Sequence, residues 1–152
     1  MFLYRINLMA RGFNPQSRFT RLGKITSDFG VPTDQEASHG GIDIANEMGT
    51  PIPAMTDGVV TKVEGGHTQG EQNFGNQIEI KNSVGDTIQL NHLRDLNVRV
   101  GQRVKKNQNV ATMGNTGATA SKSGLGDGTN LDVRIISAYG QYKSPMVYLR
   151  NL

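Results

Sequence analysis

The strongest constraint on the fold is the repeated change between short β-type runs and turns of glycine, asparagine and aspartate. The run GNQIEIKN at 75–82 alternates Ile78 and Ile80 with polar residues, and TIQLNHL at 87–93 follows a hairpin-like VGD turn. Such alternation is typical of a strand with one buried face. No segment has a convincing helical period, and the 19 glycines favour turns. We therefore predict an all-β domain of antiparallel sheets, with one polar face that carries a shallow groove.

The composition excludes several classes of function. The chain has no cysteine, which rules out disulfides, cysteine-based zinc knots and thiol catalysis. Its net charge of +3, with acidic and basic residues interspersed, suits a polyanionic neighbour such as a bacterial cell wall. No basic run is interleaved with aromatic residues, so we predict no nucleic-acid partner. No apolar window approaches the roughly 18 residues of a transmembrane helix, so we predict no membrane partner.

The first 22 residues differ in texture from the rest of the chain. They contain four arginines, no acidic residue and no continuous apolar core of a secretory signal. We predict a basic N-terminal arm or linker at 1–22 and a peptidase-like domain at 23–152. Two long loops interrupt the strand pattern of that domain, at Gly65–Gly75 and Asn115–Thr129. Loops of this length in a small domain are often functional, so we expect them to form the walls of the groove.

The three histidines are the residues most able to carry chemistry. His39 and Asp43 are separated by Gly40, Gly41 and Ile42, and imidazole and carboxylate are both ordinary zinc ligands. The two glycines would let both side chains reach one point, although so short a motif also arises by chance. His92 lies near the end of a predicted strand, where a hydrogen-bonded structural role is equally open. His67 lies in a glycine-rich loop and is expected to be exposed.

Taken in order, several segments resemble the lysostaphin/LytM-type murein metallopeptidases over about residues 24–136. They are SDFGVP, SHGGIDIANEMGTPIPAMTDGVVTKVE, FGNQIEI, QLNHL, VRVGQRVKKNQNVATMGNTG and NLDVRI. The resemblance implies that family's all-β fold and hydrolysis of a peptide bond in peptidoglycan. In the family, the His and Asp of a His-x-x-x-Asp motif and the last His of a His-x-His motif bind one zinc ion. The other two histidines assist the attacking water and the oxyanion.

By this resemblance, His39 and Asp43 are metal ligands and His92 is a catalytic residue. The final His-x-His falls on Asn130 and Asp132, and no histidine follows His92. A carboxylate at position 132 can ligate zinc, but two aspartates neutralise the ion and weaken its ability to acidify water. The amide of Asn130 can donate a hydrogen bond to an oxyanion but cannot take up a proton. We therefore predict a degenerate site with weakened or lost zinc binding and impaired catalysis.

The predicted function is a peptidoglycan-directed domain in a phage tail tip or baseplate, located in the virion tail, with weak or no catalysis. Cellular enzymes of this kind must be exported, whereas a virion protein needs no secretory signal. Residues 1–22 would then attach to a neighbouring tail or baseplate protein. Substrate-binding residues stay unknown, with Lys122 a candidate for holding a stem-peptide carboxylate.

Two alternatives stay open. One is an active metal-dependent peptidoglycan endopeptidase that uses Asp132 as a ligand or completes its site with Asp127. The other is a biotinyl/lipoyl-like carrier domain, which the hairpin texture resembles. A carrier needs a lysine at a tight hairpin tip, and the adjacent candidates Lys105 and Lys106 precede the NQNV segment. The carrier interpretation is therefore disfavoured.

Overall fold

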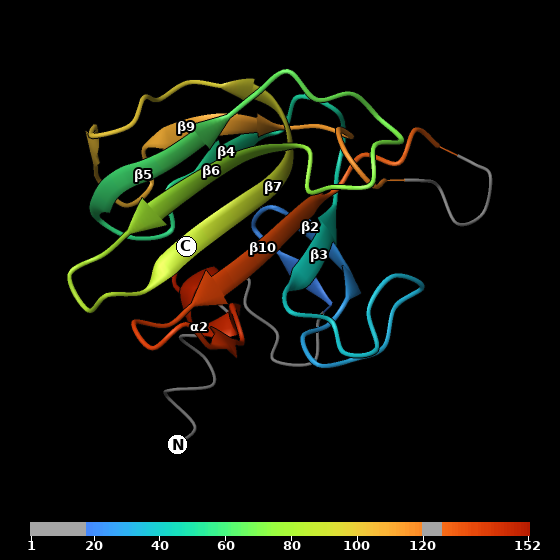
Figure 1. Cartoon of the computed structure of the whole chain (residues 1–152), viewed down its shortest axis with the longest axis horizontal. Coiled ribbons are helices and arrows are strands. Elements are labelled where there is room, and N and C mark those ends of the chain that lie inside the picture. Colours follow the sequence, from blue (N-terminus) through green and yellow to red (C-terminus); the bar gives the residue numbers. More distant parts are fainter. Residues whose placement is uncertain (1–17, 120–125) are drawn as a thin grey trace, which may run out of the picture.

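The computed structural model describes residues 18–119 and 126–152, which form one large antiparallel sheet (Figure 1). The strands are β1 (Phe19–Thr20), β2 (Gly23–Ser27), β3 (Ile42–Ala45), β4 (Pro51–Pro53), β5 (Gly58–Glu64), β6 (Asn76–Lys81), β7 (Thr87–Leu96), β8 (Arg103–Val104), β9 (Asn109–Met113), β10 (Leu131–Ile136) and β11 (Tyr142–Lys143), followed by the helix α2 (Met146–Leu149). Every pairing between these strands is antiparallel. The prediction of an antiparallel all-β domain is confirmed.

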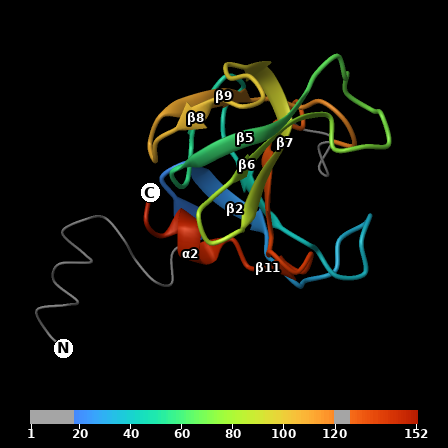
Figure 2. The same cartoon turned by 60° about the vertical axis from the view of Figure 1, so that its left-hand side comes forward.

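The order of the strands places β10 at the centre of the sheet. The sequence of neighbours is β1-β2-β3-β10-β7-β6-β5-β8, so β10 lies between β3 and β7 (Figure 1). The end of β7 pairs with β9, which also pairs with β4, and these strands cover one side of the molecule (Figure 2). The central position of β10 brings together segments that are far apart in the sequence.

The two faces of β10 explain how the core and the groove are separated. Leu131, Val133 and Ile135 are fully buried in the apolar core, as the two-residue period of a strand requires. Asp132 and Arg134 project from the opposite face and are also buried, with relative exposures of 2% and 4%. The core therefore supports the strand from one side, while charged groups gather on the other.

The described part of the predicted arm joins the sheet. Phe19 pairs with Lys24 of β2, and Leu22 is buried in the core. Residues 1–17 lie outside the described residues, so the predicted boundary at 22 stays a prediction. No helix in the described ranges is long and apolar enough to cross a membrane.

Candidate metal centre and groove

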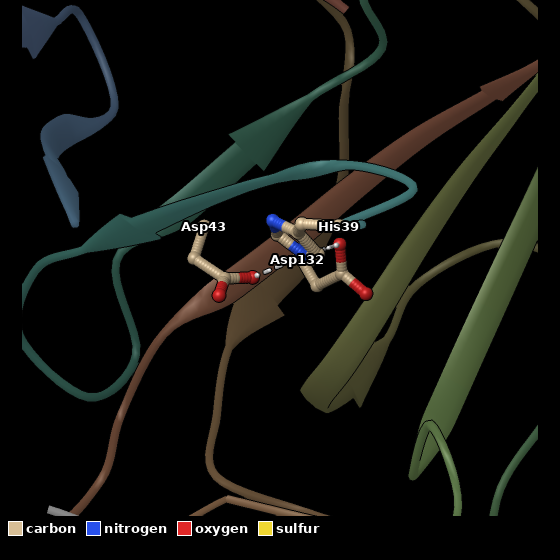
Figure 3. Close-up of side chains that lie close together, drawn as sticks. All are labelled: His39, Asp43 and Asp132. Carbon is tan, nitrogen blue, oxygen red and sulfur yellow. Dashed lines mark ion pairs between the residues drawn. The ribbon is translucent and has the colours of Figure 1, made fainter. Parts of the chain in front are cut away.

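Three side chains from different parts of the chain meet at the polar face of β10 (Figure 3). His39 lies just before β3, Asp43 lies on β3, and Asp132 lies on β10 directly opposite Asp43. The approach requires a small residue at position 41, because a Cβ there would lie 2.4 Å from Asp132 Oδ1 and 2.5 Å from the Val133 carbonyl oxygen. Gly41 thus allows the segment between His39 and Asp43 to lie close to β10, and the side chains of both residues point to one place.

The donor atoms of the three residues are spaced as ligands of one ion. His39 Nε2 lies 3.5 Å from Asp43 Oδ1 and 3.5 Å from Asp132 Oδ1. Zinc bonds of roughly 2.1 Å in a tetrahedron place neighbouring ligand atoms about 3.4 Å apart. All three donor atoms lie within 4.8 Å of one another. An aspartate side chain is shorter than a histidine side chain, but the direct pairing of β10 with β3 brings Asp132 within reach of His39 and Asp43.

The strongest indication that a cation binds here is the environment of Asp132 Oδ1. This atom is buried and has no hydrogen-bond partner among the described residues. A buried carboxylate oxygen without a partner is costly, and its desolvation is offset when it coordinates a cation. The Ser27 hydroxyl lies 3.1 Å from His39 Nδ1, so the ring can donate Nδ1–H and keep Nε2 for a metal. The residues present therefore fit a divalent metal ion.

The electrostatics of the cluster also favour a cation. Burial, and next the facing carboxylate of Asp132, raise the pKa of Asp43 to about 7. Burial lowers the pKa of His39, but the contact with Asp132 and the charges of both carboxylates outweigh burial and leave that pKa raised. Two carboxylates thus face each other across one imidazole, and their mutual repulsion adds to the effect of burial on Asp43. A divalent ion between them would relieve this repulsion.

The other oxygen of Asp132 belongs to a polar network that the sequence did not reveal. Arg134 Nε donates to Asp132 Oδ2 at 2.7 Å, and Asn91 Nδ2 donates to the same oxygen at 3.2 Å. Arg134 also forms an ion pair with Glu36. Burial raises the pKa of Asp132, but the contact with His39 and the charge and hydrogen bond of Arg134 outweigh it and hold the pKa below its usual value. Asp132 is therefore ionised at neutral pH.

A local irregularity of β7 aims His92 into the groove. Asn76 pairs with Leu93 and Ile78 with Leu90, so β7 has one more residue than β6 between these pairs. His92 takes up the distortion with a φ of 65°, and Leu90 and Leu93 both stay in the core. Such bulges often redirect a side chain beside an active site.

The hydrogen bonding of His92 leaves one ring nitrogen available. His92 Nδ1 lies 2.7 Å from the Thr116 carbonyl oxygen, which can only accept, so Nδ1 carries the proton. Nε2 is then an acceptor. Burial lowers the pKa of His92, which keeps the imidazole neutral at pH 7. This histidine is suited to accept a proton from water.

Asn130 also lines the groove, but its side chain is turned to the backbone. Its Nδ2 donates to the Gly128 carbonyl at 2.9 Å, and its main chain bridges to Gly114, the residue that follows β9. The structure thus places Asn130 beside the cluster in the position that the resemblance gave to a catalytic histidine. An amide there offers no group that can gain a proton.

The groove has a volume of about 1180 Å³, and both predicted loops contribute to it. Asn73 and Phe74 come from the first loop, and Asp127 comes from the second. Residues 120–125, with Lys122, lie outside the described residues. His67 is not in the groove lining and is held between Glu64 and Glu71 at 2.8 and 2.6 Å, rather than freely exposed as expected.

Parts of several known proteins are similar in sequence to this chain. Peptidoglycan DD-endopeptidase ShyC of Vibrio cholerae is 38% identical over 85 residues, which are 56% of this chain and 18% of ShyC. Murein hydrolase activator NlpD of Escherichia coli is 35% identical over 105 residues, 69% of this chain and 26% of NlpD. The chain thus matches only about a fifth to a quarter of the length of these relatives.

Solved structures agree with the fold. A mutant catalytic domain of the prophage-encoded M23 protein EnpA of Enterococcus faecalis superposes with a TM-score of 0.66 and 26% identity, covering 86% of this chain and 94% of that one. The lysostaphin catalytic domain of Staphylococcus simulans superposes with a TM-score of 0.68 at 24% identity and covers 84% of this chain and 92% of that one. At this identity the similarity shows the fold alone. The sequence profile of peptidase family M23 matches residues 37–143, a range that includes both Lys105 and Lys106 of the carrier alternative. The resemblance to lysostaphin/LytM-type enzymes is confirmed, and the chain belongs to peptidase family M23.

Proposed function

We propose that this chain is a peptidoglycan-directed domain that holds one divalent metal ion between His39, Asp43 and Asp132 and hydrolyses wall peptides slowly. The observation that carries the proposal is the buried Asp132 Oδ1, which has no hydrogen-bond partner in the described ranges and lies 3.5 Å from His39 Nε2. The metal would polarise the scissile carbonyl and make a water molecule more acidic. Family membership supports peptidoglycan as the substrate.

The slow rate follows from the residues beside the metal cluster. His92, with its free Nε2, would accept the proton of the attacking water. Asn130 would donate a hydrogen bond to the developing oxyanion, but it cannot exchange a proton with it. One acid–base group is typically worth about 100- to 10,000-fold in rate. We expect the native chain to be slower than a variant with imidazole at position 130 by a factor in that range.

The test combines metal content with hydrolysis of purified cell walls. We expect near-stoichiometric metal in the native protein, its loss in Asp132→Ala, and faster wall hydrolysis in Asn130→His. Asn109→His is the matched control, because Asn109 is exposed on β9 outside the groove lining. A native rate equal to that of Asn130→His would support the fully active endopeptidase that uses Asp132. No metal in the native chain would overturn the proposal.

We further propose that the domain acts as part of a phage tail tip or baseplate. The support is the structural similarity to the prophage-encoded EnpA domain, at 26% identity. Residues 1–22 are the proposed attachment to a neighbouring tail protein. Immunogold labelling of purified virions with an antibody to residues 23–152 tests this location. Labelled tail ends are expected, and unlabelled virions from a lysate that contains the protein would contradict it.

A second candidate function is activation of a separate murein hydrolase. It is favoured by the 35% identity to NlpD, whose name describes such an activator. An activator needs the groove surface but no hydrolytic chemistry of its own. Stimulation of a purified murein hydrolase by both the native protein and Asp132→Ala would support this candidate. Loss of all wall-directed activity in Asp132→Ala would favour the metal-dependent hydrolase.

A further inference from the structure

We infer that Arg134 is a positioning residue that, together with Asn91, holds one oxygen of Asp132 and presents the other to the metal ion. The inference rests on the proposed metal site. Arg134 would not touch the metal or the substrate. It would act through Asp132, by deciding which carboxylate oxygen is free and where that oxygen points.

The two hydrogen bonds to Asp132 end on the same atom. Arg134 Nε and Asn91 Nδ2 both donate to Oδ2, at 2.7 and 3.2 Å. Oδ1 has no hydrogen-bond partner among the described residues and faces His39 Nε2, as the close-up shows (Figure 3). Rotation of the carboxylate would break both bonds to Oδ2. The donors therefore define a ligand that offers one oxygen.

Arg134 is itself fixed on several sides. Its guanidinium forms an ion pair with Glu36, which comes from the loop before β3. The guanidinium also lies 4.5 Å from the centre of the Phe74 ring and 5.6 Å from the centre of the Tyr142 ring. A Cβ at Gly40 would lie 2.9 Å from Arg134 Nη1, so the space beside the guanidinium is filled. With its side chain only 5% exposed, Arg134 has little freedom to release Asp132.

The orientation of the Asn91 amide is fixed by a second set of hydrogen bonds. Gln77 Nε2 donates to Asn91 Oδ1 at 2.8 Å, and Lys62 Nζ donates to Gln77 Oε1 at 2.7 Å. Because Asn91 Oδ1 accepts from Gln77, Asn91 Nδ2 is the group that faces Asp132. This row of polar side chains crosses β5, β6 and β7 and ends at the carboxylate on β10. Asp132 is thereby held from both sides.

The charge of Arg134 makes its effect depend on the residue at position 132. Beside an aspartate, the guanidinium holds one carboxylate oxygen and balances a buried negative charge. Beside a neutral histidine, the same guanidinium would only repel an incoming divalent ion. Removing Arg134 should therefore weaken metal binding in the native chain and fail to weaken it in an Asp132→His background. A purely structural role would weaken binding in both backgrounds alike.

The experiment measures zinc affinity by chelator competition in a double-mutant cycle of Asp132→His and Arg134→Met. Loss of a group that orients a metal ligand typically reduces affinity about 10- to 100-fold, which is the change expected for Arg134→Met in the native background. In the Asp132→His background, Arg134→Met should leave zinc affinity equal to or higher than that of Asp132→His alone. Arg103→Met is the control, because Arg103 is exposed on β8 at the far edge of the sheet.

The outcomes separate the inference from the proposed function. Equal zinc affinity of Arg134→Met and the native chain, or an equal loss in both backgrounds, would overturn the inference while the metal site stands. No zinc binding by the native chain would overturn both. If circular dichroism shows that Arg134→Met does not fold, the zinc affinities of Arg134→Lys and Asn91→Ala test the inference instead. Affinity at least 10-fold below native in both is expected, and native affinity in both would overturn the inference.

Discussion

Metal affinity should fall steeply as pH is lowered below 7, because the ion must displace protons from the cluster. Asp43 has a pKa of about 7 in the metal-free protein, owing first to burial and then to the facing Asp132 carboxylate. His39 also has a raised pKa. A metal ion binds only the carboxylate and the neutral imidazole, so each protonated group competes with it. Acid therefore opposes binding, and affinity rises as pH increases through the pKa of Asp43.

The size of the effect follows from the pKa of Asp43. At pH 5, two units below a pKa of about 7, the ionised form of Asp43 is roughly 1% of the population. Affinity should therefore be about 100-fold lower at pH 5 than its plateau above pH 8, which corresponds to about 2.7 kcal/mol. Protonation of His39 adds to this loss. An ordinary surface carboxylate, with a pKa near 4, would give almost no change over the same range.

The assay is zinc competition with a chelator of known proton affinity at pH 5, 6, 7 and 8. Calorimetry in buffers of different ionisation enthalpy would count the protons released, and one to two per metal are expected at pH 6. Zinc affinity that is constant between pH 5 and 7, with no proton release, would refute the raised pKa of Asp43.

Two substitutions test other parts of the fold. Gly41→Ala places a Cβ 2.4 Å from Asp132 Oδ1. We expect metal affinity to fall at least 10-fold and the free energy of unfolding, measured in urea, to fall by about 1–3 kcal/mol. Native values of both quantities would contradict the close approach of Gly41 to β10. Asp86→Ala leaves the Tyr148 hydroxyl and Lys143 without their 2.6 and 2.7 Å contacts and should lower the free energy of unfolding by about 1–3 kcal/mol. Burial raises the pKa of Asp86, but Lys143 and Tyr148 outweigh it, so the Asp86 contribution is full above pH 3.8 and is lost on acidification. If the free energy of unfolding fell by the same amount in the native protein and in Asp86→Ala between pH 5 and pH 2, a stabilising contribution from ionised Asp86 would be excluded.

The sequence was sufficient to predict an antiparallel all-β domain, with β6 and β7 among its strands, and to name the three side chains that meet at the candidate metal centre. Alternation in β6 and β7 and the order of the motifs are local signals, and Asp132 was found because it replaces an expected histidine. The ion pair of Arg134 with Glu36 joins residues 98 positions apart and depends on a loop conformation that no periodic pattern encodes. Arg134 shares a strand face with Asp132, so its polar placement could have been noticed from the two-residue period.

The bulge at His92 is a second feature that the pattern could not provide. A regular strand would place Leu90 and His92 on the same face, yet Leu90 is in the core and His92 lines the groove. The positive φ of His92 reverses the alternation at this point. A non-glycine residue in that conformation is uncommon, and residue type alone did not indicate it. The direction of the His92 side chain is therefore set by the bulge in the pairing of β7 with β6.

The most direct test of the metal site is the metal content of the protein purified without chelator, measured by elemental mass spectrometry. We predict near-stoichiometric metal in the native chain, with almost none in Asp132→Ala and unchanged content in an Asp57→Ala control, since Asp57 is exposed outside the groove lining. A native chain without metal, alongside an Asn130→His/Asp132→His variant that binds one zinc ion, would contradict the proposal. It would show that the fold keeps the site while Asp132 does not serve as a ligand.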